Sequence, residues 1–104
     1  MAIKPALREE LRNSQRMLRS YQSQLAKLPR GSLVRRIVKG HGYYYLVMRV
    51  KGRVKVEYRG KASPQEILRY KDAKRKRAQY RNLISRLKKQ IAYLKGTLRG
   101  RQAV

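Results

Sequence analysis

Two segments of the chain carry apolar residues at alternating steps of three and four, the spacing of a helix that packs along another helix. The first, residues 4–28, ends at Pro29, which cannot continue a helix. The second, residues 63–98, begins at Ser63-Pro64-Gln65-Glu66, a capping box with proline at the first helical position. The stripe positions are Leu7, Leu11, Ser14, Leu18, Tyr21, Leu25 and Leu28 in the first segment, and Tyr70, Ala73, Arg77, Tyr80, Ile84, Leu87, Ile91, Leu94 and Leu98 in the second.

Residues 33–59 change to a pattern typical of strands. Runs rich in Val, Ile and Tyr are separated by Gly40-His41-Gly42 and Lys51-Gly52-Arg53, which we interpret as turns. The expected strands are residues 33–39, 43–51 and 53–59. The predicted fold is therefore α+β. A three-stranded antiparallel meander is inserted between two long helices, which form an antiparallel coiled-coil hairpin (helix-β-β-β-helix). We expect a single domain over residues 1–104, with 99–104 as a basic tail; pairing of the helices between two chains, as a homodimer rather than a monomer, is the alternative.

The length of the second turn decides which side chains share a face of the sheet. A two-residue turn places Met48 opposite Lys55, whereas a three-residue turn matches the apolar faces of the two strands. We expect the three-residue turn, which pairs Val50 with Val54, Met48 with Val56 and Leu46 with Tyr58.

Charge separates this chain from most small domains. It has 29 Lys and Arg residues against five Asp and Glu, a formal net charge of +24. The cations run from Lys4 to Arg101, and a polyanion such as a nucleic-acid backbone is the partner that such a charge favours. The apolar run from Tyr43 to Met48 is far short of a membrane span, and no apolar signal peptide is seen. We expect a soluble cytoplasmic protein, associated with the nucleoid or ribosome and not with a membrane.

The predicted sheet would expose tyrosines interleaved with cations on the face opposite its apolar side chains. Such a surface can stack bases, follow a backbone or enter a DNA major groove. Opposed like charges, Arg49 with Lys55, are destabilising in a free sheet and suggest an anionic ligand. The alternative is that the tyrosines shield the sheet and the charges face solvent. The candidate residues are Arg35, Arg36, Tyr43, Tyr45, Arg49, Lys51, Arg53, Lys55 and Arg59.

The second predicted helix supplies further candidates for phosphate contact. Lys74, Arg81 and Lys88 recur every seven residues, and Arg75 lies in the same basic run. Few acids are available to balance these cations at i,i+4 spacing, although a charge run is often only a solvated helix face. Arg77 occupies a stripe position, where it either reaches out to solvent or marks helices that diverge around the sheet.

Nothing in the sequence indicates catalysis. Paired carboxylates, a nucleophile beside a base and a phosphate-binding glycine loop are absent, so we expect no enzyme. His41 lies between two glycines that we expect at positive φ, without ligand-spaced neighbours, and is interpreted as a turn residue rather than a metal ligand. No metal or other cofactor is expected.

Three short motifs carry a resemblance. Gly31-Ser32-Leu33-Val34, Tyr43-Tyr44-Tyr45-Leu46 and Tyr58-Arg59-Gly60-Lys61, between heptad helices, resemble a group of small prokaryotic proteins of unknown function. That resemblance implies the architecture and no particular activity. At the level of fold alone, the strand-strand-strand-helix order is similar to the arm-binding domains of phage integrases and to plant-type three-stranded DNA readers.

The sequence therefore predicts a non-enzymatic nucleic-acid-binding protein that contacts phosphates through its sheet and its long basic helix, with DNA slightly favoured over RNA. A mobile element or the nucleoid would be the setting for DNA. The alternatives are a ribosomal or RNA-associated structural protein, and a protein-interaction module whose coiled coil docks an acidic protein partner or inhibits a nucleic-acid enzyme. Electrostatic binding to anionic membranes is disfavoured, because the helical stripes are core-like and lack a Trp or Phe face rimmed by lysines.

Overall fold

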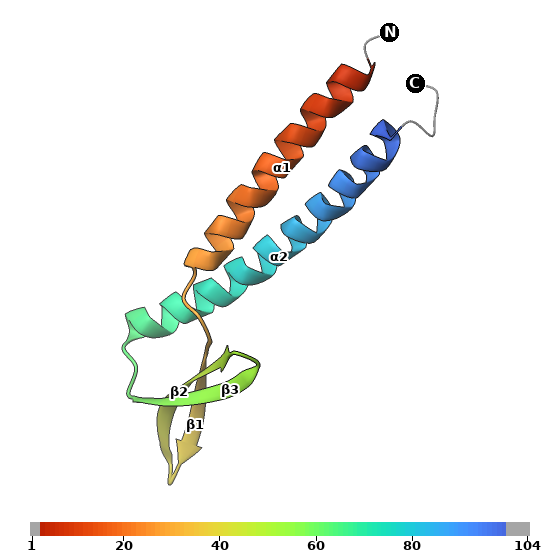
Figure 1. Cartoon of the computed structure of the whole chain (residues 1–104). Helices are drawn as coiled ribbons and strands as arrows, with labels where there is room; N and C mark the ends of the chain where they lie inside the picture. The colour runs from red at the N-terminus through yellow and green to blue at the C-terminus, as the bar shows by residue number, and fades with distance from the viewer. Residues whose placement is uncertain (1–2, 100–104) are drawn as a thin grey trace. The chain divides into compact units, whose positions relative to one another are not determined.

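A computed structural model describes residues 3–99 and shows a helix, three strands and a second, longer helix (Figure 1). The elements are α1 (Ile3–Lys27), β1 (Ser32–Val38), β2 (His41–Val50), β3 (Arg53–Gly60) and α2 (Pro64–Leu98). The predicted α+β architecture, helix-β-β-β-helix, is confirmed. Of the predicted basic tail, residues 99–104, all but Arg99 lie outside the described residues.

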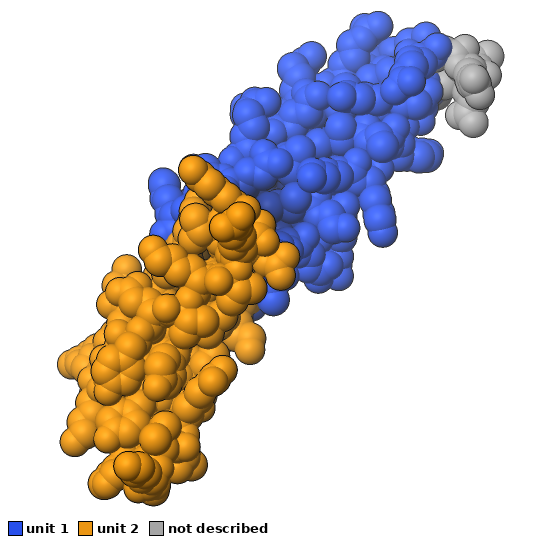
Figure 2. All heavy atoms as spheres, turned by 60° about the horizontal axis from the view of Figure 1, so that its bottom comes forward, with its two compact units in different colours: residues 1–27, 78–104 blue, residues 28–77 orange. Residues whose placement is uncertain are grey.

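The chain divides into two compact units, which Figure 2 distinguishes by colour. Residues 1–27 and 78–104 form the first, here called the helical unit, and residues 28–77 form the second, the sheet unit. Helix α2 contributes its first part to the sheet unit and its remainder to the helical unit. The expectation of a single domain over residues 1–104 stays a prediction.

In the helical unit, α1 and the second part of α2 run antiparallel and pack along their apolar stripes (Figure 1). Four stripe residues of α2 are buried here, namely Ile84, Leu87, Ile91 and Leu94. The rings of Tyr21 and Tyr80 lie 5.9 Å apart between the helices. Ser14, a polar residue within the apolar stripe of α1, is only 2% exposed. The Gln90 side-chain amide donates to Ser14 Oγ at 3.2 Å and to Glu10 Oε1 at 3.1 Å. The predicted hairpin is thus formed within one chain, with a polar bridge at its centre.

In the sheet unit, the strands are ordered β1-β2-β3 and are joined by two-residue turns. The turns are Lys39-Gly40 and Lys51-Gly52, and all four residues have positive φ, between 50° and 79°. This combination is typical of type I′ hairpins, whose twist matches that of the flanking strands. The prediction that Gly40-His41-Gly42 forms a turn was wrong in part, because His41 and Gly42 belong to β2 and Gly42 has no positive φ.

The predicted register of β2 and β3 was also wrong. Val50 pairs with Arg53 and Met48 with Lys55, the pairing that a two-residue turn imposes. Tyr44 faces Gly60 and Tyr45 faces Tyr58, so that Arg59 is an extra residue, as in a β-bulge. The twist preference of the turn overrides the matching of apolar faces. The apolar side chains of β3 therefore lie on the face opposite Leu46.

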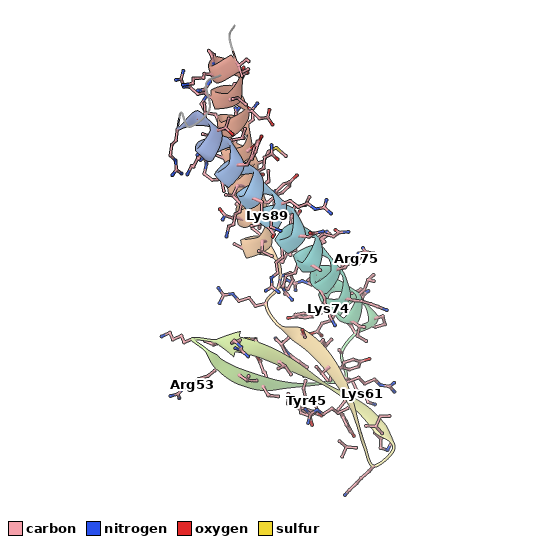
Figure 3. All side chains as sticks on the ribbon, turned by 90° about the vertical axis from the view of Figure 1, so that its right-hand side faces the viewer. Tyr45, Arg53, Lys61, Lys74, Arg75 and Lys89 are labelled. Atoms are coloured by element: carbon pink, nitrogen blue, oxygen red, sulfur yellow. The ribbon has the colours of Figure 1, made fainter. Side chains whose placement is uncertain are left out.

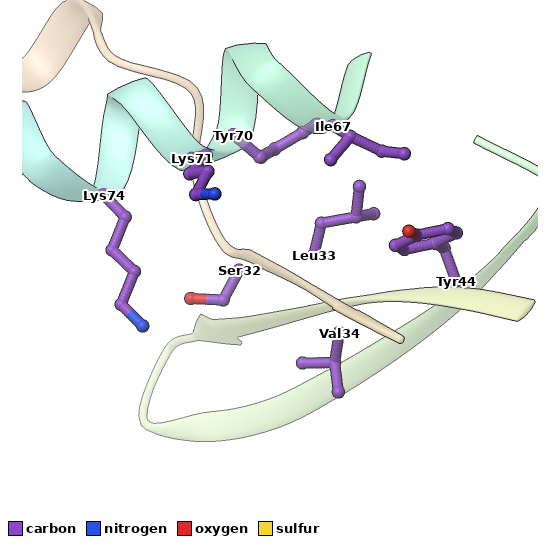
Figure 4. Close-up of a pocket in the computed structure, with 8 residues that line it drawn as sticks. All are labelled: Ser32, Leu33, Val34, Tyr44, Ile67, Tyr70, Lys71 and Lys74. Carbon is purple, nitrogen blue, oxygen red and sulfur yellow. The ribbon is translucent and has the colours of Figure 1, made fainter. Parts of the chain in front are cut away.

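The covered face of the sheet packs on the beginning of α2. Leu46, 1% exposed, and Ala73 of α2 are the buried apolar residues of this unit. Figure 4 shows Leu33 pointing toward Ile67 of α2, beside a cavity of about 340 Å³. The cavity is lined by Ser32, Leu33, Val34, Tyr44, Ile67, Tyr70, Lys71 and Lys74.

Two hydrogen bonds explain where α2 begins and why it tolerates an arginine in its stripe. The Glu66 amide donates to Ser63 Oγ at 3.1 Å, which confirms the predicted N-cap. The guanidinium of Arg77 donates to the main-chain carbonyl of Pro29 at 2.6 Å. Pro29 follows α1, so Arg77 satisfies a carbonyl oxygen that the chain leaves without a helical partner.

Candidate nucleic-acid interface

The face of the sheet that α2 does not cover, here called the open face, differs from the one expected. Figure 4 shows Leu33 and Val34 on opposite sides of β1, with Val34 directed away from α2. Directly paired residues share a face, so the register assigns the other members. They are Ser32, Val34, Arg36 and Val38 of β1; His41, Tyr43, Tyr45, Val47 and Arg49 of β2; and Val54, Val56 and Tyr58 of β3.

An aromatic cluster occupies one end of the open face. The ring of Tyr58 lies 5.3 Å from that of Tyr45 and 6.2 Å from that of Tyr43, centroid to centroid. Both pairs are tilted, which suits the quadrupoles of the rings. The guanidinium of Arg36 lies over Tyr45, 5.7 Å from its centroid, and the His41 ring is 6.4 Å from Tyr43. Three tyrosines and a stacked arginine thus form one continuous surface.

Exposed valines extend this cluster along β3. Val54 is 62% exposed, Val56 55% and Tyr58 59%, values high for side chains on one face of a sheet. Val34 and Val38 of β1 are exposed as well. The open face therefore carries exposed valines beside its aromatic cluster.

The charges of the sheet are distributed otherwise than predicted. Arg49 pairs with Val54 rather than with Lys55, so the expected opposition of like charges is absent from this pair of strands. Lys55 and Glu57 lie on the Leu46 side, opposite Met48 and Leu46. The open face therefore carries arginines, Arg36 and Arg49, among apolar and aromatic side chains.

Two other predicted site residues are engaged elsewhere. Arg35 pairs with Tyr44 on the covered face, and its Nε lies 2.6 Å from where a Cβ on Gly42 would be, so glycine makes room for it. Arg59, in the bulge, lies within 4.0 Å of the carboxylates of Glu57 and Glu66. The prediction that Lys55 and Arg59 share a face with Tyr45 was wrong, because it depended on the three-residue turn.

The remaining sheet candidates are at the hairpin tip. Lys51 is a turn residue with a φ of 50°, and Arg53 begins β3 beside it. Both are exposed, and Figure 3 shows the Arg53 side chain at this end of the sheet.

The candidate residues of α2 are exposed on both parts of the helix. Lys74 and Arg75 belong to the sheet unit, where Arg75 donates to Asp72 at 3.1 Å. Figure 3 shows their side chains projecting from the ribbon of α2. Arg81 and Lys88 belong to the helical unit, where Lys95 continues the same step of seven residues. The structure thus exposes every predicted cation of this helix.

Helix α1 carries a basic stripe that was not predicted from the sequence. Lys4, Arg8, Arg12, Arg16 and Arg19 follow one another at steps of four, four, four and three, so they share one side of the helix. Arg12, Arg16 and Arg19, with Gln15, line a shallow hollow of about 320 Å³. The spacing of the cations, rather than of the apolar residues, was the signal that could have revealed it.

The described residues hold neither a metal-binding cluster nor a membrane span. Within residues 3–99, no three His, Cys, Asp or Glu side chains gather closely enough to bind a metal ion. In the same range, neither α1 nor α2 is both long and apolar enough to cross a bilayer.

Comparison with known protein families assigns the chain to one of them. A model of a domain of unknown function, DUF6788, matches residues 2–69, which is more than half of the chain. The chain belongs to the DUF6788 family. The DUF6788 match reaches from α1 through the sheet to the first turns of α2. No curated protein and no solved structure matches the chain. The resemblance to small prokaryotic proteins stays a prediction.

Proposed function

We propose that this protein is a non-enzymatic, nucleic-acid-binding protein that makes mainly sequence-independent contacts with phosphates. The supporting observation is an exposed cationic surface that the protein's own acids do not balance. Glu57 and Glu66 both lie beside Arg59, and Asp72 lies beside Arg75. Glu10 accepts a hydrogen bond from Gln90. Because the five acids are already subtracted in the formal net charge of +24, all of that net charge is left for an external anion.

Each unit offers cations by itself. In the helical unit they lie on α1, as Arg8, Arg12 and Arg16, and on α2, as Arg81 and Lys88. Such spacing along a helix suits a regular row of phosphates, and release of condensed counterions then supplies free energy of binding. The sheet unit adds Arg49, Lys51 and Arg53 around its second hairpin. Charge does not discriminate DNA from RNA, so the proposal covers both, with DNA first.

The first experiment asks what the purified protein carries. Protein prepared at low salt should show a high ratio of absorbance at 260 to 280 nm, and the ratio should fall after nuclease treatment. Sequencing the nucleic acid cross-linked to the protein in cells would then identify the bound class. A protein that is free of nucleic acid, and that an acidic protein captures while DNA and RNA do not, contradicts the proposal and favours an interaction module.

A polyanion control separates recognition of nucleic acid from simple charge attraction. Polyglutamate presents carboxylates without bases or a regular phosphate spacing. We expect it to compete poorly with an oligonucleotide at equal charge concentration. If polyglutamate competes as well as the oligonucleotide, the surface attracts any polyanion by charge alone, and the proposed function would fail.

A further inference from the structure

We infer that the open face of the sheet is a stacking platform for unpaired bases, so that the nucleic acid bound there is single-stranded or looped. This inference rests on the proposed function and names the site and the form of nucleic acid. The supporting observation is the juxtaposition of the exposed Tyr58 with the half-buried Tyr43 and Tyr45 and with Arg36 on the open face.

The chemistry of the open face fits bases better than phosphates alone. Phosphate binding needs only cations, which the helices already supply in number. Here the side chains are aromatic rings and valines, with Arg36 stacked on Tyr45 and Arg49 further along β2. Exposed rings and guanidinium planes are the groups on which single-stranded bases stack, and the arginines can also meet the backbone. Paired bases within a duplex do not offer their ring faces to such a surface.

Charge favours a nucleic acid over a second copy of the chain as the occupant. The acidic residue of β3, Glu57, lies on the other face, opposite Leu46. The cations Arg36 and Arg49 belong to the open face, and Lys51 and Arg53 lie at one end of it. Self-association through this face would bring together two chains of formal charge +24, whereas a polyanion is attracted.

Tyr58 is the residue that the inference singles out. It contacts both Tyr43 and Tyr45 and remains 59% exposed, so its ring is supported on one side and accessible on the other. Such a ring is pre-positioned and loses little side-chain entropy when a base covers it. The exposed guanidinium of Arg36, which lies over the ring of Tyr45, is the second platform.

The test compares two ligands and matched tyrosine variants by fluorescence anisotropy. The ligands are a labelled single strand of about 12 nucleotides and a closed hairpin duplex, measured at about 0.3 M salt to weaken backbone attraction. Tyr58→Val and Tyr45→Val remove a ring and keep a residue that favours strands. Tyr93→Leu removes a tyrosine that is 72% exposed on α2, and serves as the control.

We expect each sheet variant to weaken single-strand binding at least about fivefold, and to leave duplex binding within about twofold. Tyr93→Leu should change neither. Equal losses for the two ligands, or no loss for the single strand, would overturn the inference. If the inference fails but both ligands bind the unmodified protein in dilute buffer, the proposed function still stands. If neither ligand binds the unmodified protein in dilute buffer, the proposed function and the inference both fail.

Photochemical cross-linking provides a readout that does not depend on the folding of a variant. A single strand containing 4-thiouracil, irradiated on the unmodified protein, should attach to Tyr43, Tyr45 or Tyr58, located by mass spectrometry. Attachment confined to the helices would contradict a platform on the sheet. Light scattering of the nucleic-acid-free protein should give a monomer. A dimer that Val56→Lys dissociates would instead assign the open face to a second copy.

Discussion

Tyr45 and Tyr58 lie directly opposite each other on β2 and β3, with ring centroids 5.3 Å apart. A three-residue turn would have placed Arg59 beside Tyr45 and put Lys55 and Glu57 on the same face. The two-residue turn, together with the extra residue Arg59, instead brings tyrosines together and leaves the valines of β3 exposed. The most distinctive surface of the molecule is therefore set by two turn residues, Lys51 and Gly52.

The conformation of that turn can be tested by stability. Gly52 has a φ of 78°, and a side chain there would meet open space, so the cost of Gly52→Ala is purely conformational. We expect a loss of about 1 kcal/mol in the free energy of unfolding, measured by denaturant titration. Gly96→Ala is the matched control, since Gly96 lies within α2 and also faces open space. Gly96→Ala should raise the free energy of unfolding by about 0.5 kcal/mol. If Gly52→Ala also raised the free energy of unfolding, the turn described here would be contradicted.

Arg77 should be more important for stability than other arginines of α2. Arg77→Met removes the hydrogen bond to the Pro29 carbonyl but keeps much of the aliphatic contact. We expect a loss of about 1.5–3 kcal/mol in thermal or chemical unfolding, the range for a hydrogen bond from a charged group. Arg81→Met, at an exposed site on the same helix, should change stability by less than about 0.5 kcal/mol. Similar effects at the two positions would show that the bond to Pro29 contributes little.

The buried Ser14 tests how tightly the two helices pack. Ser14→Ala removes the hydroxyl, but the Gln90 amide keeps its bond to Glu10, so the loss should stay below about 1 kcal/mol. Ser14→Leu would make the apolar stripe of α1 continuous. The serine side chain is only 2% exposed, however, so a larger side chain has little room there. Overpacking there should cost about 1–3 kcal/mol. A more stable Ser14→Leu protein would mean that the helices are packed loosely at this point.

Arg49 and Lys55 provide a comparison between the two faces of the sheet. Both side chains are exposed and each carries one charge, but Arg49 lies on the open face and Lys55 on the opposite one. Arg49→Ala should weaken binding of a single strand and lower the slope of log K against log salt by about one, as expected for one lost backbone contact. Lys55→Ala should change both quantities less. The reverse order would place the bound strand on the covered face.

The sequence predicts an element of this structure well where its pattern of apolar residues is long. The helices were predicted within one or two residues, because a stripe such as Ile84, Leu87 and Ile91 repeats over many turns, and Ser63 and Pro29 mark its limits. The register of β3 was predicted wrongly, because only a few residues define it. There the positive φ of Lys51 was decisive, and lysine carries little signal for that conformation.

The candidate site shows the same contrast. Tyr43, Tyr45 and Arg49 were placed on the exposed face correctly, since alternation within β2 is enough to assign them. Tyr58 was assigned to the covered side, and Lys55 to the exposed one, because both assignments needed the pairing with β2. Arg59 could not have been interpreted from the sequence, as its position in a bulge follows from contacts across strands.

The salt dependence of nucleic-acid binding tests the central claim most directly. The protein, freed of nucleic acid by nuclease and high salt, would be titrated with single-stranded and duplex oligonucleotides at several salt concentrations. If about six to ten phosphates are engaged, affinity should fall about 10³- to 10⁵-fold between 50 and 200 mM salt. No binding in dilute buffer, or an affinity that salt leaves unchanged, would contradict the account.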